Sequence, residues 1–258
     1  MYEKGLPMVI NKFAAVLAGV ATLVLSDAPR AAVIFTDNST VGGNAVTASA
    51  SFAISGTTLT ITLQNSSPGN PSEAPTSTLT GLSFLVNGLD PALTPVSAIS
   101  PNAIVNSANC DAQACTGTNV NVGGEWGYQQ NFGGKEGIGS AGYITTGLSG
   151  NLGNFNGVNL ENPTSLDGIE FGILSASYGA LNGGLTGQAQ IDDTITLTLT
   201  VPSGTTENQI GSVSFLYGTK PDATIGGTPV VPTPEPGSLA LLGMGLLGFG
   251  ILRRRQSS

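Results

Sequence analysis

Histidine is absent from this chain, and only 9% of its 258 residues are Asp, Glu, Lys or Arg. Without imidazole, neither a Ser-His-Asp nor a Cys-His nucleophile can be built, and no metal site can use a histidine ligand. So few charges leave little material for surface helices stabilised by Glu–Lys pairs. No P-loop and no strand followed by a G-x-G-x-x-G turn occurs, which argues against nucleotide binding.

Positive charge is scarcest in the central part of the chain. The whole sequence has 8 Lys and Arg against 16 Asp and Glu. Between residues 31 and 233 only Lys135 and Lys220 remain against 13 acids, a net charge of about −11. A nucleic-acid partner is therefore not expected, because phosphate binding needs clustered Lys and Arg. The acidity suits either calcium binding or the solubility of a secreted protein, and we favour solubility.

Apolar residues alternate with Thr or Ser along several segments, which is the period of a half-buried strand. The clearest case is Asp192 to Val201, and Ser51 to Leu63 is typical of two strands around a Ser-Gly turn. Further strands are expected at residues 79–86, 93–99 and 213–217. The sequence predicts an all-β fold, an antiparallel sandwich of Ig-like or jelly-roll-like type with long Gly-rich loops. The Thr ladders have no fixed-period repeat, so ordinary strands explain them better than an ice-binding solenoid.

The segment from residue 116 to 187 is rich in glycine and carries scattered aromatic residues. Long loops could present Trp126 and Tyr128 for stacking on sugar rings, or these rings could fill a core short of large residues. The acids of this region, Glu125, Glu136, Asp167 and Glu170, are the candidates for the paired carboxylates of a glycosidase. Scattered surface acids are the alternative interpretation, and we assign no catalytic residue.

The N-terminus has the pattern of a secretory signal peptide, an apolar run from Phe13 to Leu25 preceded by Lys12. We expect residues 1–30 to be the signal peptide, with cleavage near residues 28–32, and residues 31–218 to be the exported body. In an exported chain, Cys110 and Cys115 are expected to form a local disulfide that pins a loop. A pair of thiolate ligands is the alternative, although zinc would need two more ligands.

The C-terminal residues combine Pro234-Glu235-Pro236, an uncharged run from Gly237 to Leu252, and the cluster Arg253-Arg254-Arg255. About 16 helical residues span about 24 Å, which is short of the roughly 30 Å bilayer core. We expect a short transmembrane helix with the arginines on the cytoplasmic side; a buried core helix is the alternative. The Gly/Pro-rich residues 219–233 are expected to be a linker. The predicted membrane segment is formed by Leu239, Leu241, Leu242, Leu246, Leu247, Phe249, Ile251 and Leu252.

Residues 231–243, read with the triple arginine, resemble the PEP-CTERM sorting signal, which places the sorting tail at residues 234–258. The resemblance implies an exosortase, a membrane-embedded cysteine protease or transpeptidase that recognises Pro-Glu-Pro and removes the tail. It also implies a Gram-negative-type bacterium that makes exopolysaccharide. Residues 126–143, 159–173 and 213–219 resemble segments of exosortase-dependent surface proteins, a resemblance that carries no activity.

The sequence therefore predicts an exported protein of the cell surface or extracellular matrix. We expect a structural or adhesive role in an exopolysaccharide layer, with the chain a substrate of the exosortase and not itself an enzyme. No cofactor is expected; Asp192-Asp193 could help to bind calcium but lack the D-x-D-x-D-G loop. The alternatives are a secreted carbohydrate-active hydrolase that uses paired carboxylates, and a membrane protein that keeps its tail.

Overall fold

A computed structural model describes residues 31–69, 72–87, 93–110, 115–140, 158–160, 170–218 and 224–230. Within these ranges the chain forms β-strands and short 3-10 turns, and no α-helix is described. Most strand pairs are antiparallel, so the predicted all-β fold with antiparallel sheets is confirmed. The predicted signal peptide and the C-terminal helix lie outside the described residues. The choice between an Ig-like and a jelly-roll-like sandwich stays a prediction.

The first sheet has seven described strands in the order β18-β1-β2-β3-β15-β6-β8, and every neighbouring pair is antiparallel. Its strongest pairings are the β1–β2 and β2–β3 hairpins, whose turns contain glycines with positive φ at Gly42, Gly43 and Gly56. The Ser-Gly turn predicted near residue 56 is thus observed. The strands are β1 (Val33–Val41), β2 (Asn44–Ser55), β3 (Thr58–Asn65), β6 (Thr94–Ser100), β8 (Val120–Asn121), β15 (Thr194–Thr200) and β18 (Thr228–Val230).

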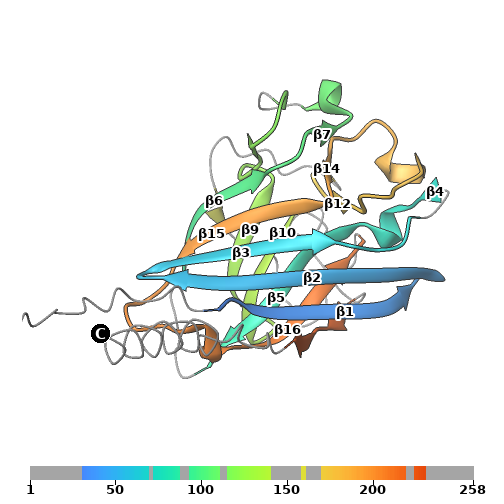
Figure 1. The fold of residues 1–258 in the computed structure, drawn as a ribbon. Helices are drawn as coiled ribbons and strands as arrows, with labels where there is room; N and C mark the ends of the chain where they lie inside the picture. Colours follow the sequence, from blue (N-terminus) through green and yellow to red (C-terminus); the bar gives the residue numbers. More distant parts are fainter. Residues whose placement is uncertain are drawn as a thin grey trace, which may run out of the picture.

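The second sheet has nine described strands and crosses behind the first in Figure 1. Its path is β11-β9-β10-β5-β12-β14-β7, and β16 pairs with both β5 and β17. Among its described strands, β12 and β14 are the one parallel pair. Its strands are β5 (Leu79–Val86), β7 (Ile104–Val105), β9 (Trp126–Phe132), β10 (Lys135–Ser140), β11 (Val158–Asn159), β12 (Ile173–Leu174), β14 (Gln190–Asp192), β16 (Ile210–Tyr217) and β17 (Thr224–Gly226).

Short elements complete the described structure. A parallel pair joins β4 (Ser72–Glu73) to β13 (Ala180–Leu181). The 3-10 turns are η1 (Pro75–Ser77), η2 (Ser107–Asn109), η3 (Gly183–Leu185) and η4 (Glu207–Gln209).

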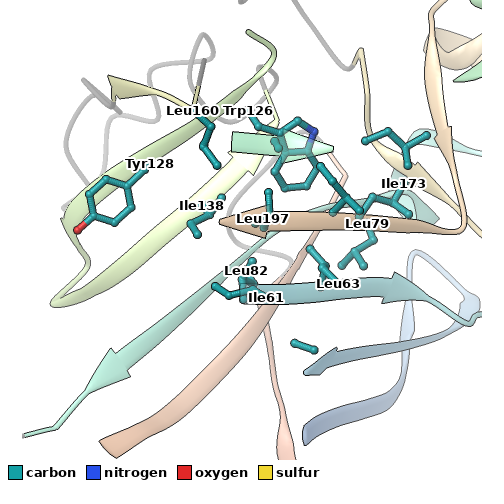
Figure 2. Packing of buried hydrophobic residues seen from close by; sticks show 14 of the residues in the cluster. Ile61, Leu63, Leu79, Leu82, Trp126, Tyr128, Ile138, Leu160, Ile173 and Leu197 are labelled. Atoms are coloured by element: carbon teal, nitrogen blue, oxygen red, sulfur yellow. The ribbon is translucent and has the colours of Figure 1, made fainter. Parts of the chain in front are cut away.

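The core lies between the two sheets, whose inner faces contribute to one cluster of buried side chains. Phe52 of β2 contacts Phe84 of β5 with ring centroids 5.3 Å apart, and Phe35 of β1 meets Phe52 edge to face at 5.8 Å. Figure 2 shows Ile61, Leu63 and Leu197 of the first sheet against Leu79, Leu82 and Ile138 of the second. Burying each such side chain stabilises the fold by about 1.5–3 kcal/mol. Alternate residues of β3 and β15 supply this layer, as their sequence period predicts.

Candidate functional site

Residues 224–230 belong to the sheets, which corrects that part of the linker expected at residues 219–233. β17 pairs with β16 through Thr224, Ile225 and Gly226, and β18 pairs with β1 through the next three strand residues. The chain therefore passes from the second sheet to the first at Gly227, whose N–H donates to the Val213 carbonyl at 2.8 Å. The folded body extends to Val230 and does not end at residue 218.

Gly227 allows this change of sheet because the chain passes close to two phenylalanines. A Cβ added at this position would lie 3.0 Å from Cε2 of Phe215 and 3.3 Å from Cβ of Phe35. Beyond it, Pro229 suits an edge strand, since its missing N–H can face away from the partner strand. The Gly and Pro residues that resemble a linker in the sequence thus serve a sheet edge.

The two ends of the body meet at this edge. β1 begins at Val33 and β18 ends at Val230, and Val230 lies opposite Ile34 in the antiparallel register. Residues opposite each other in such a pair have Cα atoms about 4.5–5.5 Å apart. The described body therefore begins and ends at the same end of this sheet edge.

The outer face of the seven-stranded sheet joins the two Thr ladders into one array. In the β3–β15 register, Thr62 lies opposite Thr196, Thr60 opposite Thr198, and Thr58 opposite Thr200. Hydroxyl side chains continue on the neighbouring strands, with Ser51 opposite Thr62 and Ser97 opposite Thr198. We call this set of Thr and Ser residues the hydroxyl face. The sequence alone does not join the two ladders, because the β3–β15 pairing connects segments about 130 residues apart.

The two aromatic residues considered for glycan contact, Trp126 and Tyr128, are core residues. Trp126 is 0% exposed, and its Nε1–H donates to the Phe171 carbonyl at 3.1 Å. Figure 2 places its ring beside Leu79 and Ile173, in the cluster between the sheets. Tyr128 is 6% exposed, and its hydroxyl donates to Oε2 of Glu136. Neither ring offers a face to a sugar, so the structure supports the core-filling interpretation.

The candidate carboxylates are buried as well. Glu125, Glu136 and Glu170 are 2%, 7% and 3% exposed, while Asp167 lies outside the described residues. Glu136 accepts the hydrogen bond of Tyr128, and burial together with this carboxylate raises the pKa of the tyrosine.

Further buried acids were missed by the sequence analysis because burial follows from strand pairing. Asp37 of β1 accepts from the Tyr217 hydroxyl at 3.3 Å, and Glu73 accepts from the Ser77 hydroxyl at 2.9 Å. Burial raises the pKa of both carboxyls, although these hydrogen bonds oppose the shift. Glu207 of η4 accepts the N–H of Ile54 at 3.0 Å. These acids tie the two sheets and their turns together.

The predicted disulfide is present between Cys110 and Cys115, with Cα atoms 6.2 Å apart. It follows η2, and Cys115 is 3% exposed and belongs to the core cluster. The cross-link therefore fixes the loop between β7 and β8 against the body.

Asp193, one of the two acids considered for calcium, takes part in side-chain hydrogen bonds. Asp193 accepts two hydrogen bonds from Nε2 of Gln64, both at 3.1 Å, and one from the Thr194 hydroxyl at 2.7 Å. Among the residues that the structure describes, no group of three or more acids or cysteines could hold a metal ion. Over the same residues, no helix is long and apolar enough to cross a membrane.

Comparison with known families decides the nature of the tail. The family model of the PEP-CTERM protein-sorting motif matches residues 232–255. The chain carries a PEP-CTERM sorting motif. The motif supports exosortase-dependent sorting of an exported protein, with the exosortase as processing partner and export to the cell envelope or surface as the outcome. No curated protein and no solved structure gave a significant match.

Only Val231 separates the last paired residue of β18 from the first residue matched by the PEP-CTERM model. The motif is thus attached directly to the edge of the seven-stranded sheet. The predicted processing residues Pro234, Glu235 and Pro236 lie within the matched range, as do the predicted membrane segment and Arg253 to Arg255. Their structure lies outside the described part of the chain.

Proposed function

We propose that this protein is a structural or adhesive component of an exopolysaccharide layer, delivered to the cell surface as an exosortase substrate. The observation that carries the proposal is the PEP-CTERM motif at residues 232–255, joined to a folded β body by one residue. A sorting motif on a rigid body suits a protein that is placed on a surface and then acts there through its faces.

The hydroxyl face supports the adhesive role. It presents Thr60, Thr62, Thr196 and Thr198 side by side on neighbouring strands, each of them half-buried. Hydroxyls both donate and accept hydrogen bonds, which matches the hydroxyl-rich surface of a polysaccharide. An uncharged face also lets an acidic body approach an acidic polysaccharide without direct repulsion between charges.

Burial of Glu125, Glu136 and Glu170 supports a role for these acids in the fold. A glycosidase needs two carboxyl groups that flank a bound sugar, one to protonate the leaving group and one to act as base or nucleophile. Side chains that are only 2–7% exposed offer little surface from which a carboxyl group could reach a substrate. We therefore favour a structural or adhesive protein over a carbohydrate-active hydrolase.

The sorting part of the proposal is tested on protein recovered from producing cells. The measurements are its intact mass and the cell fraction in which it is found. We expect a product that ends near Pro234 to Pro236 and is found outside the membrane fraction. A full-length C-terminus at Ser258 in the membrane fraction would instead mean a retained anchor, and the proposed route to the matrix would be wrong.

Binding to the exopolysaccharide of the producing cells tests the adhesive part. We expect the fourfold variant T60V/T62V/T196V/T198V to bind at least tenfold more weakly, because valine keeps the shape and strand preference of threonine without its hydroxyl. Thr116→Val, at an exposed position away from the sheet, is the matched control. Equal affinity of the fourfold variant and the control would refute binding through the hydroxyl face.

A further inference from the structure

The described body begins and ends at one end of the sheet, where Ile34 lies opposite Val230. The same end contains the β2–β3 turn, because Val33 at the start of β1 lies opposite Phe52 near the end of β2. The end of β15 lies there as well, with Thr200 opposite Thr58, and the chain continues from it to η4. The Ile54 N–H bond to Glu207 joins this turn to η4. We call residues 55–58 and 201–209, with the start of β1 and the end of β18, the termini end.

The chain that follows the termini end is short. Nine residues lead from Val230 to Leu239, where the apolar run of the tail begins, so this spacer spans at most about 30 Å when fully extended. The spacer contains Pro232, Pro234 and Pro236, and proline-rich sequences favour extended conformations. A linker of residues 219–233 would have allowed the body to tumble, but residues 224–230 belong to the sheets.

Charge is distributed unevenly between the two ends of the seven-stranded sheet. Glu207, the acid of the described termini end, is 3% exposed. Asp192 and Asp193 are partly exposed and lie at the opposite end of β15, which is about 20 Å long. That length exceeds the Debye length of about 8 Å at physiological salt, so these acids are screened from a surface at the termini end.

We propose that, before the tail is removed, the body docks with its termini end on the lipid headgroups of the membrane. This inference rests on the proposed function only in that the tail engages the membrane. The short proline-rich spacer limits how far the termini end can move from the bilayer. The partly exposed acids of the described residues, Asp192 and Asp193, lie at the opposite end of β15. The occupant of this surface is the headgroup layer.

Energy transfer to a headgroup-labelled lipid tests the orientation. The full chain, with its disulfide intact, is reconstituted in vesicles of phosphatidylcholine and phosphatidylglycerol. A donor dye is attached through Thr57→Cys at the termini end, or through Thr40→Cys near the far end of β1; both positions are exposed. These sites differ by roughly 20 Å along the strand direction. We expect at least twofold higher transfer from position 57, and equal transfer or higher transfer from position 40 would overturn the proposal.

An insertion variant and added enzyme sharpen the test. Ten Gly and Ser residues inserted after Val231 should abolish the difference in energy transfer between the two dye positions, because a long flexible spacer frees the body. A difference that persists would overturn the role of the spacer.

If the difference in energy transfer arises only after exosortase is added, the enzyme and not the lipid is the occupant, and the proposal is wrong. Failure of the unmodified chain to float with the vesicles would refute membrane engagement itself, and with it the proposed route of sorting.

Discussion

At the scale of single residues, Gly227 controls how the last segment of the body is joined to the two sheets. Gly227→Ala is expected to destabilise the body by about 1–3 kcal/mol, because its Cβ would crowd Phe215 and Phe35. Gly226→Ala is the matched control, since a Cβ there meets nothing within 4 Å. Urea unfolding of the two variants provides the measurement, and equal midpoints would contradict the crowding argument.

Glu73 gives the body a pH dependence that is opposite to ordinary acid denaturation. Burial raises the pKa of this carboxyl above its usual 4.5, with the Ser77 hydrogen bond opposing the shift. Above pH 4.5 the unfolded chain ionises while the folded chain keeps the proton, so the free energy of unfolding falls as pH rises towards the folded-state pKa. Glu73→Gln keeps an acceptor for Ser77 but cannot ionise. Urea unfolding at several pH values from 4.5 to 7.5 should show a smaller decrease of the unfolding free energy in this variant than in the unmodified body. An identical decrease in both proteins would show that Glu73 does not cause the pH dependence.

At the scale of secondary-structure elements, β18 depends on its pairing with β1. N–H groups alternate in direction along a strand, so Thr228 and Val230 are expected to direct theirs to β1 while Pro229 faces outward. Val230→Pro should remove one bond to β1 and speed amide exchange of Ile34 and Thr36 by about fivefold, equivalent to about 1 kcal/mol. Val230→Thr keeps the N–H and should leave exchange unchanged. Faster exchange throughout β2 and β3 as well would indicate general destabilisation instead.

Strands with a clear period of two could be predicted, whereas β1 and the edge strands β17 and β18 could not. Thr194–Thr200 falls inside the predicted 192–201 segment because Ile195, Leu197 and Leu199 all face the core. β1 was missed because Asp37, Asn38 and Ser39 are typical of turns, and its pairing with β2 overrides that local preference. β17 and β18 were taken for a linker because Gly and Pro are also the residues that sheet edges tolerate.

The site residues show the same difference between local patterns and long-range contacts. The sorting motif and the disulfide were predictable, since a contiguous pattern and a short cysteine spacing are local in the sequence. The position of Trp126 was not, because its burial depends on Phe171 and on strands far along the chain. The union of the Thr ladders likewise depends on a pairing that no local pattern encodes.

At the scale of the whole molecule, the acidic body should respond to ionic strength. A net charge of about −11 over residues 31–233 repels itself, and salt screens that repulsion. Raising NaCl from 10 to 150 mM is expected to increase the Tm of the body by about 2–4 °C, which corresponds to about 1 kcal/mol. Differential scanning calorimetry measures this, with sucrose of equal osmolarity as the control. A Tm that falls with salt would show that net attraction between charges prevails.

The meeting of Ile34 and Val230 at one edge also determines how the body bears load. When force is applied between the two ends of the body, it opens the β1–β18 pairing from its end, one hydrogen bond after another, instead of sharing the force among all of them. The body is therefore weak when stretched between its ends. In a matrix it would carry tension through its lateral faces, with the chain termini as a point of attachment on one side.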